Sequence, residues 1–368
     1  MKNSQKRILA MLSIALLILS LCSCSQKNNS DIQTDSSESS YSEQNEEQFV
    51  NGGTITLGSY PQSKVIDENI LSELNTQPLN WVSYGYYDGA FSWESGYGSM
   101  VQGDWMRYAD VSLDGEKYRA VIFDEYRPID TQDKAGRESE QKVGGFEEGV
   151  VYWYKYEPLK WRVLDAEAGL ILSENIIDSQ PFNNYIYQWH VILEENGAGN
   201  YAYFVDENNT IPVNDWAYSS VREWLNSDFY STAFSENDTS KIQNSTLKND
   251  GIQSWIFNHT NYDHDYADTQ DKVFLLSVDD ALNTAYGFSS ETGKSETRTC
   301  KGTDYAIVQG LNNQGTSSWI LRSATRMGQV EGEGPENIGY VRDDGYLSDL
   351  GGTSGTSGGI RPAMMINY

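Results

Sequence analysis

Residues 158–173 read PLKWRVLDAEAGLILS, two apolar segments on either side of a short acidic segment that ends in glycine. In the first segment Trp161 and Val163 alternate with charged residues, and the second segment is almost wholly apolar. Alternation with a period of two, then a turn signal and a second apolar run, is typical of a β-hairpin. The sequence therefore predicts an antiparallel pair of strands at this point of the chain.

Short segments rich in β-branched and aromatic residues predict further strands on both sides of this hairpin. They are Thr54–Gly58, Lys117–Phe123, Gly149–Tyr156, Lys272–Leu276, Ser318–Arg322, Gly339–Arg342 and Ile360–Tyr368. Asp344 and Gly345 lie between two apolar pairs and predict a tight hairpin turn near the C-terminus.

The helix signals are few and short. Asp67 precedes the apolar residues of a short helix that ends at Leu74, and serines with an acid three residues later begin helices at Ser220 and Ser277. Gly287 is expected to stop the last of these helices. Short strands, a few short helices and long loops together indicate an α+β domain.

The N-terminus has the pattern of a secretory signal. Three basic residues precede the apolar run Ile8–Leu21, whose 14 residues fall short of the ~20 needed to span a bilayer. The run ends in Leu21-Cys22-Ser23-Cys24, which resembles the lipobox of bacterial lipoproteins. The resemblance implies that residues 1–23 are a signal peptide and that the thiol of Cys24 is lipidated.

Residues 24–50 are polar and acidic, with few sizeable apolar side chains, and are expected to form a disordered tether. Residues 51–368 contain no second linker and are expected to form one domain, in which 77–150 is an aromatic-rich expansion. After Cys24, Cys300 is the only remaining thiol, so we expect a buried small side chain there and no intramolecular disulfide.

The charge excludes some classes of partner. The chain has 53 acidic and 26 basic residues, a net charge of −27, whereas nucleic-acid binding depends on Lys and Arg that neutralise phosphates. A basic face for anionic lipid is equally disfavoured. We therefore expect no nucleic-acid partner, and contact with the membrane only through a lipid on Cys24.

Several segments in a fixed order carry a family resemblance. They are Leu57–Gln62, Leu159–Leu164, Leu170–Ser173, Ser220–Asn226, Asp271–Ser277, Trp319–Ser323 and Gly359–Ala363. Together they resemble an uncharacterised domain of surface lipoproteins from Gram-positive gut bacteria, over most of residues 51–368. The last two segments are also similar to C-type-lectin-like folds, a group that includes the enzymes that generate formylglycine.

This second resemblance implies a mostly antiparallel, C-type-lectin-like sheet with a few short helices and long loops, in which the N- and C-terminal strands pair. It implies a fold and not an activity. The formylglycine-generating relatives act through a pair of cysteines, and Cys300 alone cannot supply that chemistry.

Two groups of residues are candidates for a site. Asp263, Asp265 and Asp268 crowd one loop and are candidate Ca²⁺ ligands, although their spacing does not fit a twelve-residue Ca²⁺ loop and a solvated acidic loop is the favoured interpretation. Arg322 and Arg361 lie inside apolar strands, where a buried guanidinium bonded to carboxylates or carbonyls is favoured over a ligand-binding role.

Nine aromatic residues fall within the 28 residues from Trp81 to Tyr108, among glycines and serines. Such rings suit contacts to sugars or proteins. The candidate ligand-binding residues are Trp81, Tyr86, Tyr87, Trp93 and Trp105. The alternative is that these rings pack the expansion's own small core.

These observations favour a lipid-anchored module on the extracytoplasmic face of the bacterial cell membrane. We expect it to bind a glycan or another surface polymer, without catalysis and without a cofactor. One alternative is a carboxylate-based hydrolase of glycans, for which Asp165 with Asp178 or Glu174 is a conceivable pair. The other is a protein–protein adhesion module.

Overall fold

The computed structural model describes residues 49–84, 87–89, 101–103, 106–127, 139–183, 188–193, 199–206, 208, 210–253, 255, 264–312, 315–326, 337–353, 355 and 358–368. Side chains are described in these ranges except at 87–89, 101–103, 188–193, 199–204, 253 and 326. Residues 46–368 belong to one compact unit. No helix in the described ranges is long and apolar enough to cross a membrane.

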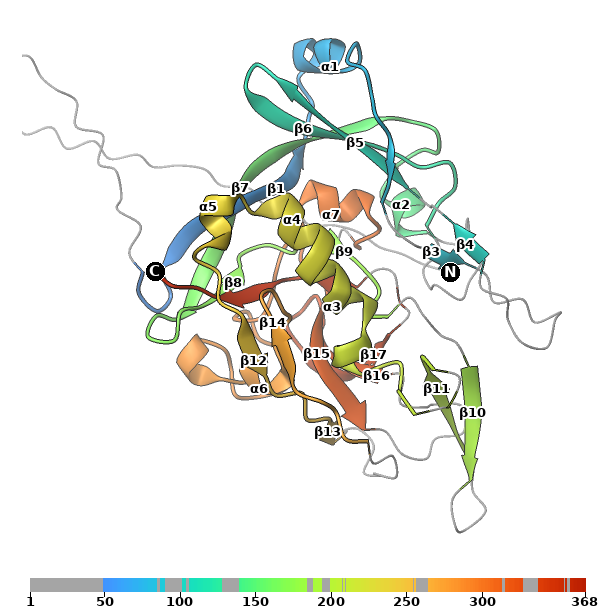
Figure 1. The fold of residues 1–368 in the computed structure, drawn as a ribbon, viewed down its shortest axis with the longest axis vertical. Helices are drawn as coiled ribbons and strands as arrows, with labels where there is room; N and C mark the ends of the chain where they lie inside the picture. Colours follow the sequence, from blue (N-terminus) through green and yellow to red (C-terminus); the bar gives the residue numbers. More distant parts are fainter. Residues whose placement is uncertain are drawn as a thin grey trace, which may run out of the picture. The chain divides into compact units, whose positions relative to one another are not determined.

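The first sheet is built around the predicted hairpin (Figure 1). Its strands are β1 (Thr54–Lys64), β2 (Val82–Ser83), β5 (Arg107–Leu113), β6 (Glu116–Ile122), β7 (Tyr152–Asp165), β8 (Leu170–Ser173) and β19 (Ala363–Met365). The order is β19-β8-β7-β6-β5-β2, all antiparallel. Lys155 pairs with Ser63 and with Tyr118, so β1 and β6 lie on opposite edges of β7.

The second sheet has the order β17-β16-β15-β18-β9, with β13 also paired to β15. Its strands are β9 (Asp178–Ser179), β13 (Ile252–Gln253), β15 (Trp319–Arg326), β16 (Asn337–Val341), β17 (Leu347–Gly352) and β18 (Gly359–Ile360). The predicted turn at Asp344-Gly345 joins β16 to β17, where Gly345 has φ +74°.

Three two-stranded ribbons complete the strands. They are β3 (Tyr87–Gly89) with β4 (Val101–Gly103), β10 (Gln188–Leu193) with β11 (Gly199–Phe204), and β12 (Ser245–Leu247) with β14 (Thr269–Asp271).

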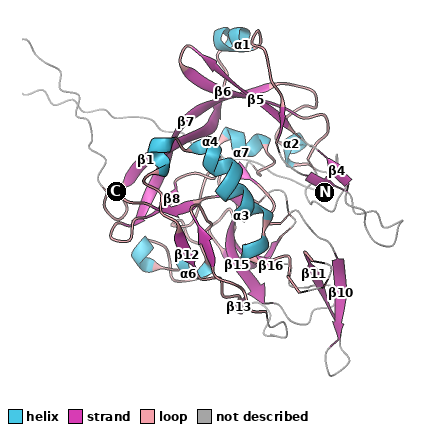
Figure 2. Cartoon of the chain, viewed as in Figure 1, coloured by secondary structure: helices cyan, strands magenta, loops and turns pink. Residues whose placement is uncertain are grey.

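The helices are short and scattered among the strands (Figure 2). They are α1 (Glu68–Leu74), α2 (Glu140–Val143), α3 (Ser220–Trp224), α4 (Tyr230–Ala233), α5 (Glu236–Thr239), α6 (Val278–Ala281) and α7 (Asp304–Val308). A π-helical turn, Leu225–Phe229, joins α3 to α4. The predicted α+β class, with mostly antiparallel sheets and few short helices, is confirmed.

One hydrophobic core joins the two sheets and the helices. It contains Trp161 from β7, Trp319 from β15 and Leu225 from the helical segment, all with no exposed side-chain surface. The Trp161 indole donates to Leu57 O at 2.8 Å and the Trp319 indole donates to Arg298 O at 3.0 Å. A second, smaller cluster lies under α1 and contains Leu74, Ala109, Tyr118, Ala120 and Trp153.

Two register shifts in β1 explain how it pairs with β7 across the two prolines, Pro61 and Pro158. At the first shift Gly58 has φ +74°, and an added Cβ would lie 2.6 Å from Ala233 O. Only glycine fits such a close approach in the left-handed region. With these register shifts at the prolines, β7 is one continuous strand. The segments Gly149–Tyr156 and Pro158–Leu164, predicted as two strands, therefore belong to the same strand.

Several helix ends follow the predicted capping. Asp67 caps α1, accepting from Asn69 N at 2.9 Å, and Ser277 caps α6 through a full capping box. The cap of α3 is Ser219 and not Ser220. Gly287, with φ +78°, ends the following 3₁₀ turn and not α6.

Three strand expectations are corrected. Lys272–Leu276 is no strand, because the chain bends at Lys272 and Val273 and Phe274 makes only an isolated bridge to Ala363. Leu276 O accepts from Arg322 N on a different neighbour. The C-terminal segment divides at Pro362 into β18 and β19, which lie in different sheets. In the described pairings, β1 pairs with β7 and β19 with β8, so the terminal strands do not pair with each other.

Candidate ligand-binding pocket

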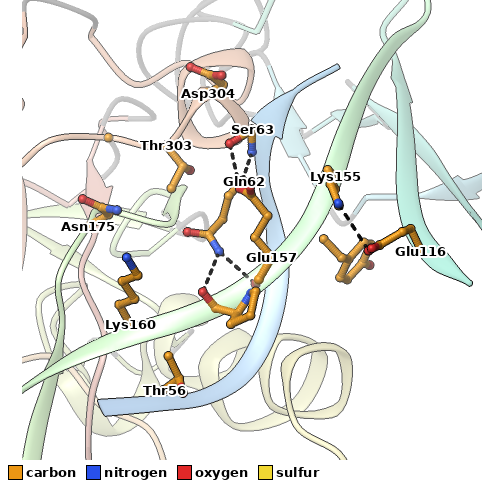
Figure 3. A pocket seen from close by; sticks show the side chains of 13 residues that line it. Thr56, Gln62, Ser63, Glu116, Lys155, Glu157, Lys160, Asn175, Thr303 and Asp304 are labelled. Atoms are coloured by element: carbon orange, nitrogen blue, oxygen red, sulfur yellow. Dashed lines mark hydrogen bonds and ion pairs between the residues drawn. The ribbon is translucent and has the colours of Figure 1, made fainter. Parts of the chain in front are cut away.

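A polar pocket lies where β1 and β7 meet the segment that leads into α7 (Figure 3). Its volume is about 770 Å³, within the range of pockets that hold small molecules. Most lining residues are polar: Thr56, Gln62, Ser63, Glu116, Lys155, Tyr156, Glu157, Pro158, Lys160, Asn175, Gly302, Thr303 and Asp304. These residues lie far apart in the sequence and are brought together by strand pairing.

The second register shift of β1 builds part of the pocket wall. It places the Gln62 side chain over β7, where its amide donates to Glu157 O at 2.9 Å and Pro158 O at 3.2 Å. These bonds hold β7 against β1 beside Pro158, which cannot donate a backbone hydrogen bond. The Gln62 side chain therefore has a positioning role.

Each carboxylate of the lining has a protein partner. Glu157 accepts from the Ser63 hydroxyl at 2.7 Å, and Asp304 accepts from Lys64 N at 2.9 Å. Glu116 pairs with Lys155 at 3.4 Å. A carboxylate has about four acceptor positions, so each of these groups keeps capacity for further hydrogen bonds.

Lys160 and Asn175 differ from those carboxylates. Neither side chain has a hydrogen-bond or ion-pair partner among the described residues, and the Lys160 ammonium points toward Asn175 and Thr303 in Figure 3. Thr303 is buried and caps α7 by accepting from Ala306 N at 3.1 Å. The pocket therefore offers one unpaired cation and one unpaired amide.

Tyr156 links the pocket to a charged cluster behind it. Its hydroxyl donates to Asp110 at 2.8 Å, and the buried Arg119 bonds the same carboxylate with two nitrogens, at 2.7 and 2.9 Å. The Arg119 guanidinium also lies 4.1 Å from the Tyr108 ring. Burial raises the pKa of Asp110, but the bonds and charge of Arg119 outweigh it, so the pKa lies below its usual value.

A second carboxylate, the buried Asp178, joins distant segments. It accepts from the Tyr60 hydroxyl at 2.9 Å, from the Tyr84 hydroxyl, and from Ser179 N at 2.7 Å. Burial raises the pKa of Asp178 in spite of these bonds. Tyr84 belongs to the aromatic-rich expansion, so one of its rings is bonded into the core of the fold.

One family model matches the chain, and its description is "Domain of unknown function (DUF6273)". The match covers residues 169–368, more than half of the chain. The chain belongs to the DUF6273 family. No curated protein and no solved structure matches the chain.

The DUF6273 match begins at Gly169, in the turn of the central hairpin. The matched region supplies Asn175, Thr303 and Asp304 to the pocket, whereas the unmatched β1 and β7 supply residues such as Gln62 and Lys160. The domain of unknown function expected from the ordered segments is confirmed over the matched residues.

The predicted aromatic residues lie apart from the pocket lining. Trp81 is half-buried and packs against the second cluster, with the Arg107 guanidinium 5.9 Å from its ring. Tyr87 lies in β3, and its side chain is not described; Tyr86, Trp93 and Trp105 lie outside the described residues. The contacts of Trp81 agree with the packing interpretation, and ligand binding by all five residues stays a prediction.

The candidate Ca²⁺ ligands do not gather in the described structure. Asp265 is exposed, Asp268 pairs with Lys248, and Asp263 lies outside the described residues. Within the described ranges no group of three or more His, Cys, Asp or Glu side chains could hold a metal ion. Cys24, the predicted lipidation site, also lies outside them.

The buried arginines and the cysteine behave as the sequence predicts. Arg322 donates to Leu275 O at 2.8 Å and pairs with Asp280 at 2.9 Å, and Arg361 donates to Ser173 O at 2.9 Å. Cys300 is buried, which raises the pKa of its thiol. These groups hold the fold together.

The conceivable hydrolase carboxylates have separate structural roles. Asp165 accepts from Glu167 N and Ala168 N in the hairpin turn, while Asp178 is buried among tyrosines. Glu174 is exposed and accepts from the Thr54 hydroxyl at 2.8 Å. The bonds of these side chains serve the fold, which argues against this particular catalytic pair.

Proposed function

We propose that the chain is a non-catalytic, lipid-anchored module on the outer face of the bacterial membrane that binds a glycan. The pocket between β1, β7 and the start of α7 is its binding site. The observation that carries the proposal is the lining itself, in which carboxylates, two amides, hydroxyls and two ammonium groups line one small volume.

Sugars need this mixture of groups. Each sugar hydroxyl both donates and accepts, so carboxylates such as Asp304 and Glu157 receive hydrogen bonds while Lys160 and Asn175 donate them. Tyr156 and Pro158 add apolar surface to the same lining, which suits the C–H face of a sugar ring. The composition of this lining therefore supports the pocket as a binding site for the surface polymer expected from the sequence.

The aromatic-rich expansion supplies a second candidate surface for the same function, with Tyr86, Tyr87, Trp93 and Trp105 as its residues. Rings on Gly- and Ser-rich segments are adaptable contacts for sugars. The two surfaces make different predictions for mutagenesis.

A glycan array probed with the purified full-length chain tests the proposal. If the pocket is the site, Lys160→Ala with Asn175→Ala abolishes retention, and Trp93→Ala with Trp105→Ala leaves it intact. The reverse pattern moves the site to the expansion. Retention of no glycan refutes carbohydrate binding, and turnover of a bound polysaccharide refutes the non-catalytic part.

Lipid anchoring rests on the lipobox-like sequence that ends at Cys24. Metabolic labelling with a fatty acid is expected to mark the wild-type chain in membranes, and Cys24→Ser is expected to release an unlabelled chain. Cys22→Ser is the matched control and is expected to remain labelled. Label that persists in Cys24→Ser would refute Cys24 as the lipidated residue, and a wild-type chain without label would refute the anchor.

A further inference from the structure

Building on the proposed function, we infer that the pocket selects a sugar unit carrying an acidic group, and that Lys160 receives this group. The ligand class follows from the Lys160 ammonium, a charge of the lining that no contact within the described residues compensates. Among the described residues, Lys160 is the lining cation without a partner, and Asn175 is an unpaired donor in the same lining.

The other charged side chains of the pocket have hydrogen-bond or ion-pair partners within the protein. Lys155 lies 3.4 Å from Glu116, so it has a carboxylate partner within the protein, which Lys160 lacks among the described residues. Glu157 and Asp304 accept backbone or hydroxyl protons but have no ion-pair partner among the described residues. The pocket thus has both a cation and carboxylates available to a ligand.

This arrangement fixes how an acidic sugar would lie. In Figure 3, Asp304 lies at the far end of the lining from Lys160, with Thr303 between them. A ligand carboxylate at Lys160 and Asn175 forms a charge-assisted hydrogen bond, while the sugar hydroxyls donate to Asp304 and Glu157. A neutral sugar offers the ammonium only uncharged hydroxyl acceptors, and a simple anion without hydroxyls leaves the carboxylates without donors.

The charge of the whole chain makes Lys160 decisive. A net charge of −27 repels anions at long range, and salt screens that repulsion beyond about 8–10 Å. Recognition of an acidic sugar must therefore depend on a cation in direct contact with it. Replacing that one cation is expected to remove the preference for acid.

The test measures, by titration calorimetry on the purified full-length chain, the affinities for oligogalacturonate and for its methyl ester. Esterification removes the charge of the carboxylate and leaves the hydroxyls unchanged. We expect the acid to bind about tenfold more tightly than the ester, and Lys160→Met to reduce this ratio to near one. Lys155→Met, a lysine of the same pocket with a partner, is the matched control and changes the ratio by less than about threefold.

A parallel arm compares glucose 6-phosphate with glucose and distinguishes a phosphate from a carboxylate as the acidic group. A Lys160-dependent gain in either arm supports the inference. Equal affinity for the acidic and neutral forms in both arms, or a preference that persists in Lys160→Met, overturns it. If neutral glycans bind in this pocket, the proposed function survives without the inference; if no carbohydrate binds, both fail.

Discussion

Residues 169–368, which match the DUF6273 family, contain β8 to β19, whereas residues 49–168 contain β1 to β7. Residues 169–368 contain every strand of the sheet built on β15. Residues 49–168 contain most strands of the sheet built on β7. Yet the buried contacts do not divide at residue 169. Asp178 accepts from Tyr60 and Tyr84, and Arg119 donates to the Tyr305 hydroxyl at 3.2 Å.

The family-matched region therefore contains the second sheet of the fold but only part of the hydrophobic core, and residues 49–168 supply the rest. β8 has β7 on one edge and β19 on the other, and Trp161 of β7 lies in the same core as Trp319 of β15. The pocket likewise takes its lining from both regions. Four experiments test how far the two regions depend on each other.

The largest effect is expected from truncation. A chain of residues 169–368 loses β7 and β1 and exposes the core that Trp161 covers, so it is expected to show no cooperative unfolding. Residues 49–368 are expected to unfold cooperatively in thermal melts followed by circular dichroism. A cooperative melt of 169–368 alone would refute the mutual dependence.

Arg119→Met is expected to destabilise the chain by about 2 kcal/mol, since it removes the two guanidinium bonds of the buried Arg119 to Asp110, whose side chain is 26% exposed, and the bond to the Tyr305 hydroxyl. The matched control is Lys117→Met, because Lys117 lies 3.5 Å from the same carboxylate but is 44% exposed. Its cost is expected below about 1 kcal/mol. Urea unfolding measures both, and equal costs would contradict a larger role for Arg119, whose bond to the Tyr305 hydroxyl reaches the matched region.

Gly58→Ala tests the close approach of β1 to the matched region. Its φ of +74° and the 2.6 Å distance from an added Cβ to Ala233 O predict a loss of about 2 kcal/mol or more. Gly115→Ala has a similar φ of +83° with nothing within 4 Å, so it isolates the backbone strain, about 1 kcal/mol. If Gly58→Ala loses more stability in urea than Gly115→Ala, the close contact with Ala233 O accounts for the difference. Equal losses would show that this contact adds nothing to the backbone strain.

The smallest effects concern pH, and the pKa shifts of Asp110 and the buried Asp178 have opposite signs. The lowered pKa of Asp110 adds stability above the usual carboxyl pKa of 3.8, and this stability is lost as the pH falls through the lowered value. The raised pKa of Asp178 does the reverse, so its contribution declines as the pH rises from 3.8 through the raised value.

Free energies of unfolding in urea at several pH values measure these slopes. Asp110→Asn is expected to flatten the loss of stability in acid, and Asp178→Asn is expected to remove a decline toward neutral pH. If the stability of Asp178→Asn declines toward neutral pH as much as that of the wild type, another group is responsible for the decline.

Features that depend on neighbouring residues could be predicted from the sequence, whereas contacts between residues far apart in the sequence could not. The hairpin around Gly169, the cap at Ser277 and the turn at Gly345 depend on neighbouring residues, which a sequence displays directly. Lys160 looks like any polar residue of an alternating strand, and only the pairing of β1 and β7 and the position of α7 place it in a pocket.

The buried role of Asp178 could not be predicted either, because the sequence has 53 acidic residues and the partners Tyr60 and Tyr84 lie more than 90 residues away from Asp178. The aromatic count did indicate an unusual segment, and the described rings of Tyr84 and Trp81 turn out to pack inward. A pattern of ring residues cannot separate a packed core from an exposed platform, since both need the same side chains.

The most direct test of the central claim is a crystal structure of the chain soaked with oligogalacturonate. The account predicts density for one sugar unit in the pocket, with its carboxylate at hydrogen-bond distance, about 2.7–3.2 Å, from Lys160 Nζ. Ligand density over Trp93 and Trp105, with Lys160 uncontacted, would contradict it.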